Sequence, residues 1–174
     1  MKHIVLIITA MLCSVAAFAQ KTFDTDFTQV KMMKISGKTT DKAGHILFDG
    51  KDNLSMTYTM PEGDYFIIEG NKVKINMDGK KAEIDANKVK MVALQRSTLL
   101  NCLSGNWEQA AVDNNAETTV TEEKGMKVVT LNAKGKVPKG GYRSVVLTYR
   151  LSDNGMVKMV LEEAAGIINT YVIK

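Results

Sequence analysis

The sequence predicts a mostly β protein with some α structure, in which a curved antiparallel sheet is covered on one side by one or two helices. Apolar and polar residues alternate in many short stretches, which is the pattern of half-buried strands. Short links with turn residues, such as Asp78-Gly79 and Asp153-Asn154-Gly155, join several of them. Only one long stretch, from Ala86 to Ser104, has helical spacing. Strands joined by short turns pair antiparallel, and a sheet of about ten strands curls.

The N-terminal residues are typical of a secretory signal peptide cleaved after Ala19. Lys2 gives a basic start, an apolar run extends from Ile4 to Ala17, and Ala17-Phe18-Ala19 fits the small-residue cleavage pattern. The run is shorter than the ~20 residues that a membrane span requires. We therefore expect a signal peptide at 1–19, which includes Cys13, and a single exported domain at 20–174.

Composition argues against nucleic-acid binding. Loss of Lys2 with the leader lowers the formal net charge from +4 to about +3, and the lysines are scattered, without the arginine and aromatic clusters of nucleic-acid grooves. Cys102 is the only cysteine beyond the leader, so no internal disulfide is expected. Its apolar neighbours favour a small buried side chain over a reactive thiol.

The first half of the domain is expected to hold one short helix and a run of strands. Phe23, Phe27 and Val30 follow a spacing of four and three residues, which predicts an amphipathic helix from Thr22 to about Lys31. The strands expected after it alternate in polarity and are bounded by turn residues: Gly44–Phe48, Leu54–Met60, Asp64–Glu69, Val73–Met77 and Lys80–Asp85.

The second half is expected to begin with the main helix and continue as a meander. The helix occupies Ala86 to Ser104, and Gly105 suits the left-handed position just past its end. Trp107 is expected to anchor the connection that follows. The remaining strands again alternate in polarity: Glu117–Glu122, Lys127–Ala133, Arg143–Leu151, Met156–Ala164 and Ile167–Ile173.

Catalytic motifs are missing from the sequence. His45 is the only histidine beyond the leader, so neither a histidine-based zinc site nor a Cys-His pair is expected, and we expect a surface or edge imidazole. Glu162 and Glu163 are adjacent in a strand and must point to opposite faces. The sequence therefore favours a protein that is not an enzyme and has no cofactor. A small lipid hydrolase is the weakest hypothesis, and loss of activity on mutating His45 would revive it.

Methionines are abundant: nine of the eleven lie beyond residue 19. The flexible, polarizable thioether suits either an irregular core or a surface that accepts varied apolar ligands. Met56, Met60 and Met77 lie on alternating strands and are expected to share one face of the sheet.

The order of several segments resembles the outer-membrane lipoprotein carriers of the LolA type. The segments are Phe27-Thr28-Gln29, Gly44-His45-Ile46-Leu47-Phe48, Tyr58-Thr59-Met60-Pro61, Phe66 to Val73, the Leu99-Leu100 helix and the Asp153-Asn154-Gly155 hairpin. The resemblance covers most of the domain. It implies an unclosed β-barrel with a helical lid. It also implies a periplasmic chaperone that takes acylated lipoproteins from an inner-membrane export complex to the outer membrane.

The sequence departs from this family at one functional position. The family usually has an Arg-Pro pair after the Gly-x-Leu strand, and that arginine is thought to help hold the lid. Here the segment is Asp49-Gly50-Lys51-Asp52. Lys51 is at best a partial substitute, because a lysine lacks the planar five-donor fork.

The hypothesis from the sequence is an apolar cavity that binds lipoprotein acyl chains. Complete burial of three chains, on the order of 40 methylenes at ~0.8 kcal/mol each, would exceed the ~20 kcal/mol at which non-covalent affinity saturates, so a carrier should shield them only partly. The choice between Ile67 and Phe66 is open, because a shift of one residue exchanges the faces of a strand. The expected lining is Leu54, Met56, Tyr58, Met60, Ile67, Val73, Ile75 and Met77 from the sheet, with Met91, Leu94, Leu99 and Leu103 from the helix.

The alternative is a periplasmic interaction or lipid-sensing module of the same fold without transport activity. Its interior would be a filled core, and its partner would be another protein. A bound acylated protein would distinguish the carrier from this module.

Overall fold

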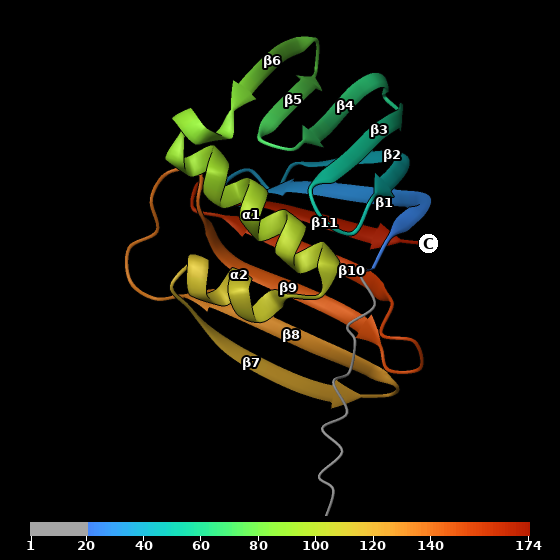
Figure 1. Cartoon of the computed structure of the whole chain (residues 1–174), viewed down its shortest axis with the longest axis vertical. Coiled ribbons are helices and arrows are strands. Elements are labelled where there is room, and N and C mark those ends of the chain that lie inside the picture. The colour runs from blue at the N-terminus through green and yellow to red at the C-terminus, as the bar shows by residue number, and fades with distance from the viewer. Residues whose placement is uncertain (1–20) are drawn as a thin grey trace, which may run out of the picture.

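The computed structural model describes residues 21–174. The predicted signal peptide 1–19, with Cys13, lies outside this part of the chain. The described residues form one antiparallel sheet of eleven strands that does not close into a barrel, with the helices on its concave side (Figure 1). The predicted fold class is confirmed.

Two meanders make up the sheet. Its order is β6-β5-β4-β3-β2-β1-β11-β10-β9-β8-β7, and the meanders meet where β1 pairs with β11, with Phe27 opposite Ile173. The strands are β1 (Phe23–Met33), β2 (Thr39–Phe48), β3 (Asn53–Met60), β4 (Glu62–Glu69), β5 (Lys72–Met77), β6 (Lys80–Asp85), β7 (Ala116–Glu123), β8 (Met126–Ala133), β9 (Tyr142–Arg150), β10 (Met156–Glu163) and β11 (Ile167–Ile173).

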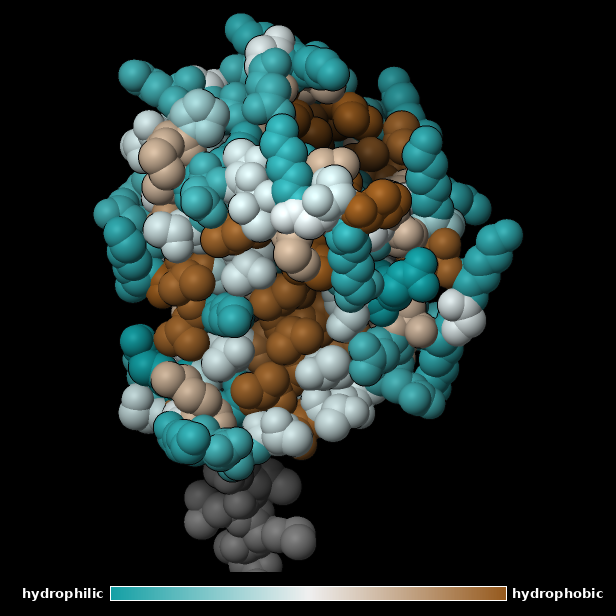
Figure 2. All heavy atoms as spheres, turned by 180° about the vertical axis from the view of Figure 1, so that it is seen from behind, coloured by the Kyte–Doolittle hydropathy of each residue, from teal (hydrophilic) through white to brown (hydrophobic). Residues whose placement is uncertain are grey.

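This topology explains why the helices cover the concave face. The chain leaves the sheet at one edge strand, β6, and re-enters it at the other, β7. The connecting segment contains a short 3-10 helix (Ala86–Lys88), α1 (Lys90–Ser104) and α2 (Trp107–Asp113), and it crosses the hollow of the sheet (Figure 1). The face away from the helices carries apolar side chains in its middle and polar ones around them (Figure 2).

The helix predicted from Thr22 to Lys31 is wrong, because these residues belong to β1. This strand pairs along its length with β2 on one side and β11 on the other. Its inward positions alternate, but they include the polar residues Gln29 and Lys31, while Val30 faces outward and is 40% exposed. Because polar residues occupy part of the inner face, the apolar residues of β1 do not show the two-residue spacing by which a strand is recognised in a sequence. With β1 included the strands number eleven, where about ten were expected.

The turn between β5 and β6 is confirmed as predicted. Asp78 and Gly79 have φ angles of 53° and 76°, and these positive values are what the central residues of a type I′ turn require. The hairpin fixes the register of β5 against β6, with Met77 opposite Lys80.

Helix α1 is attached to the sheet by its last two turns. Leu99, Leu103 and Cys102 are buried, and the Tyr149 hydroxyl on β9 donates to the Cys102 carbonyl at 3.2 Å. Burial raises the pKa of the Cys102 thiol to about 12, as expected for an unreactive side chain. Gly105 ends the helix with φ 84°, as predicted.

Trp107, which was expected to anchor the connection after α1, begins a second helix, α2, and packs against the core. Between residues 21 and 174, neither helix is long and apolar enough to cross a membrane.

Candidate functional site: a cavity between the sheet and α1

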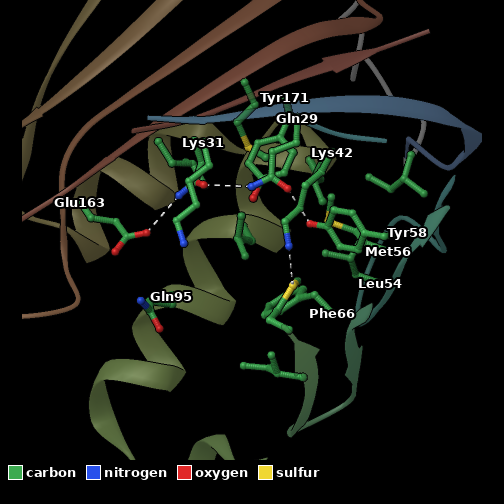
Figure 3. A pocket seen from close by; sticks show the side chains of 18 of the residues that line it. Gln29, Lys31, Lys42, Leu54, Met56, Tyr58, Phe66, Gln95, Glu163 and Tyr171 are labelled. Carbon is green, nitrogen blue, oxygen red and sulfur yellow. Dashed lines mark hydrogen bonds between the residues drawn. The ribbon is translucent and has the colours of Figure 1, made fainter. Parts of the chain in front are cut away.

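A cavity of about 280 Å³ lies between the inner face of the sheet and α1 (Figure 3). Both meanders contribute to its wall, because the β1–β11 pairing brings them together. The apolar side chains that line it are Ile46, Leu54, Met56, Phe66, Ile75 and Met77 from the first meander, Leu99 and Leu103 from α1, and Met159 and Leu161 from β10.

Seven of the twelve residues expected in the lining are found there, and five are not. The seven are Leu54, Met56, Tyr58, Ile75, Met77, Leu99 and Leu103. The five outside it are Met60, Ile67, Val73, Met91 and Leu94.

Local geometry explains the two misplaced residues of β3 and β4. A register shift at Ala43/Gly44 of β2 interrupts the alternation at the end of β3, so Met60 is 52% exposed. In β4 the inner residue is Phe66, which pairs with Met56 and Ile75. Ile67 points to the other face, so the question that the sequence left open is decided for Phe66.

The other three residues lie away from the cavity for different reasons. Val73 is buried at 3% exposure, but it packs in the core beside its partner Ile68. Met91 is in the first turn of α1 and lies against Gly140, in the loop between β8 and β9. Leu94 lines a separate hollow against the same loop.

One end of the cavity is polar, and the sequence did not indicate this. The Tyr58 hydroxyl donates to Gln29 Oε1 at 2.8 Å, Gln29 Nε2 donates to Asn169 Oδ1 at 2.9 Å, and Asn169 Nδ2 donates to Glu163 Oε1 at 3.0 Å. These bonds connect the side chains of four strands, β3, β1, β11 and β10, in one continuous chain. Each amide group has its orientation fixed by its neighbours.

A buried ion pair lies at the same end. Lys42 and Asp64 have side chains that are 7% and 6% exposed, and Lys42 Nζ is 2.7 Å from Asp64 Oδ2. Asp78 lies 3.7 Å from the same ammonium, but it is 75% exposed. The Lys42 ammonium also contacts Met77 Sδ at 3.8 Å. Because a buried charge requires a partner, Asp64 is the group that keeps Lys42 at this inner position.

Lys31 is the other basic residue of the lining. Its side chain extends from β1 toward α1, as Figure 3 shows. Between residues 21 and 174 it forms no hydrogen bond and no ion pair. Burial raises the pKa of the Glu163 carboxyl, and the charge of Lys31 and the hydrogen bond from Asn169 partly offset this.

An arginine joins α1 to the sheet, but it is on the helix. Arg96 Nε donates to the Gly70 carbonyl at 2.5 Å, and its Nη2 donates to Asp52 Oδ1 at 3.2 Å. Lys51 is 75% exposed and its ammonium lies 3.7 Å from Asp52. Whether Lys51 replaces the family arginine was left open by the sequence; in the structure the helix is joined to the Asp49–Asn53 loop by Arg96, through Asp52.

We expect Arg96→Met to loosen α1 while the sheet stays folded. The variant removes two hydrogen bonds from a charged donor, and such bonds contribute ~1.5–3 kcal/mol. Amide hydrogen exchange in α1 should accelerate about tenfold or more, with β9 and β10 unchanged. Lys51→Met is the matched control and should leave the exchange of α1 unaltered. Unchanged exchange in Arg96→Met would show that the apolar contacts of α1 alone hold it.

Two of the three residues that were considered for catalysis, His45 and Glu162, lie on the outer face. His45 is 44% exposed and its ring nitrogens lie 2.9 Å from Asp24 and 3.1 Å from Asp26, which raises its pKa through hydrogen bonding. It is a surface imidazole, as expected. Glu162 pairs with Lys34 on the outer side, whereas Glu163 lines the cavity, so the two carboxylates lie on opposite faces as predicted. In the described part of the chain no cluster of residues could hold a metal ion.

Comparison of the sequence with models of known protein families shows to which family this chain belongs. The family model described as "Outer membrane lipoprotein carrier protein LolA" matches residues 19–174. The chain belongs to the LolA family. Members of this family are carrier proteins by description, and the open sheet with a helix over its hollow is the fold that the resemblance implied.

Solved structures similar to this LolA-family chain are distant in sequence. The LolA superfamily protein of Nitrosomonas europaea is 10% identical, with a TM-score of 0.40 over 90% of this chain and 85% of that one. The MucA/MucB complex of Pseudomonas aeruginosa is 9% identical, with a TM-score of 0.44 over 86% of this chain and 50% of that one. Lipoprotein LppX of Mycobacterium tuberculosis is 9% identical, with a TM-score of 0.36 over 90% of this chain and 87% of that one. No curated protein matches the chain.

Proposed function

We propose that this LolA-family protein is a periplasmic carrier that binds acyl chains of lipoproteins in the cavity beneath α1 and delivers them toward the outer membrane. The observation that carries the proposal is the apolar cavity between the sheet and α1. The helix is held over this cavity by hydrogen bonds from the polar side chains of Arg96 and Gln95. Partners of this carrier are an inner-membrane lipoprotein export complex, which loads it, and an outer-membrane acceptor. The predicted signal peptide at 1–19 supports the same compartment.

The size of the cavity supports a carrier that releases its cargo. A volume of about 280 Å³ holds on the order of ten methylene-sized groups at ~30 Å³ each. Burial of ten methylenes is worth ~8 kcal/mol, which corresponds to micromolar affinity. The cavity in this form is too small for three acyl chains. Loading of a triacylated protein therefore requires α1 to move outward or leaves part of the chains outside.

The fastening of α1 is suited to such a movement. Close to its middle the helix is held by Arg96, which donates to Gly70 and Asp52, and by Gln95, whose Nε2 donates to the Gly140 carbonyl at 2.7 Å. Polar contacts of this kind can exchange for water without exposing apolar surface. Leu99 and Leu103 lie further along the helix, where a bound chain would replace the contacts that they make with the sheet.

The test is to fill the cavity and measure release of lipoproteins from membranes into the soluble fraction. Met56→Trp should reduce the released lipoprotein about tenfold, because the indole occupies the space of the chain. Ile75→Trp fills the cavity from another strand and should act alike. Leu47→Trp, on the outer face at 52% exposure, is the matched control and should release normally. Far-UV circular dichroism and thermal unfolding establish that each variant is folded.

Normal release by both folded cavity variants would contradict the proposal. That result would favour the interaction or sensing module, in which the interior serves only as a core.

A further inference from the structure

The polar end of the cavity contains a donor without a partner. The Lys31 ammonium has three N–H groups and, within residues 21–174, forms no hydrogen bond or ion pair. Its neighbours are already engaged: Gln29 and Asn169 bond to each other, and Gln95 donates to Gly140. Figure 3 shows the Lys31 side chain extending into the space between β1 and α1. A group entering from the apolar part of the cavity would meet this ammonium.

The charges around Lys31 favour a neutral group over an anion. Lys42 is matched by Asp64 at 2.7 Å, and Lys31 shares its end of the cavity with Glu163. Two ammonium groups thus face two carboxyl groups, and the largely exposed Asp78 adds further negative charge. Without a net positive charge, this end of the cavity offers little attraction to a free carboxylate. A carbonyl oxygen accepts a hydrogen bond from an ammonium without bringing a charge.

We propose that Lys31 donates a hydrogen bond to the carbonyl oxygen of an ester or amide at the head of a bound acyl chain. This rests on the proposed function and specifies the chemical class of its ligand. The hydrocarbon lies against Met56, Phe66 and Leu99, and the carbonyl reaches the polar end beside Gln29. The site thereby recognises chains that are covalently joined to a carrier molecule and does not favour free fatty acids.

The experiment measures displacement of Nile red from the purified protein by methyl decanoate, decanoate and decane. Wild type should bind the ester more tightly than decane and at least as tightly as decanoate. Lys31→Met should weaken the ester about tenfold and leave decane unchanged, because a hydrogen bond to a charged donor is lost. Lys31→Arg should restore the ester to within about threefold of wild type. Lys158→Met, an exposed lysine of β10, is the control and should have no effect.

Three outcomes overturn the proposal. Equal affinity of wild type and Lys31→Met for the ester would show that Lys31 does not bond to the ester carbonyl. The proposed binding of acyl chains in the cavity would not be affected by that result. Decanoate binding more than tenfold tighter than the ester would assign the site to free fatty acids. Failure of the wild type to bind any of the three ligands would overturn the proposed function as well, so the two failures are distinguishable.

Discussion

Gly44→Ala is expected to destabilise the protein by about 3 kcal/mol or more. A Cβ at this position of β2 would lie 2.2 Å from the Thr57 carbonyl oxygen and 3.0 Å from Cε1 of Phe27. The first of these atoms is backbone in the neighbouring strand, so a change of rotamer cannot relieve the clash. β2 and β3 would have to separate at the register shift, in the centre of the first meander.

Urea unfolding followed by circular dichroism measures this change. Gly155→Ala is the matched control: the nearest atoms there are Arg150 Nη2 and Asp153 Oδ1 at 3.0 Å, which are ends of flexible side chains that can move aside. We expect a loss below about 1 kcal/mol for the control. Equal stability of the two variants would mean that β2 and β3 do not approach as closely at Gly44 as described.

Asp64→Asn is expected to lower the free energy of unfolding by about 3 kcal/mol. The substitution keeps an acceptor for the Asp78 amide, which now bonds Asp64 Oδ1 at 3.0 Å, but it leaves the Lys42 ammonium buried without its counterion. Asp78, 3.7 Å away and exposed, replaces little of that interaction. The penalty arises from the isolated charge and not from the loss of packing.

A double mutant separates these two causes. Combining Lys42→Met with Asp64→Asn removes the uncompensated charge and should recover most of the lost stability, because a buried ion pair contributes little relative to apolar groups of similar size. Chemical denaturation of the two single variants and the double variant gives the coupling between the residues. A double variant that is as unstable as the sum of the single variants would contradict this explanation.

The hairpins of the fold could be predicted because local residues determine them. Asp78-Gly79 sets a turn that requires positive φ, and the alternation of Val73, Ile75 and Met77 fixes which face of β5 is inward. The helix end at Gly105 follows from a similar local requirement. These features depend on a few neighbouring residues and not on distant parts of the chain.

The failures of sequence prediction concentrate at the polar end of the cavity. Gln29 and Lys31 occupy inward positions of β1, and Lys42 occupies one of β2. Inward polar residues remove the hydrophobic period, so β1 resembled a helix and β2 was expected to begin only at Gly44. Predictions from local sequence patterns fail most often at functional sites. The failures at this end of the cavity therefore support the hypothesis that the cavity is a functional site.

Other residues of the cavity depend on pairings between distant strands. Asn169 and Tyr171 enter the lining because β11 pairs with β1, with Asn169 opposite Lys31. The alternation of β11 was recognised, but no residue in it indicates its partner. Met60 was misplaced because a register shift in β2 changes the alternation at the end of β3.

Native mass spectrometry of the protein purified from cells that contain acylated lipoproteins tests the central claim most directly. The account predicts a complex of wild-type protein with an acylated lipoprotein, and an empty protein when Met56→Trp fills the cavity. Wild-type protein that is recovered only in its ligand-free form, from cells in which lipoproteins are abundant, would contradict it.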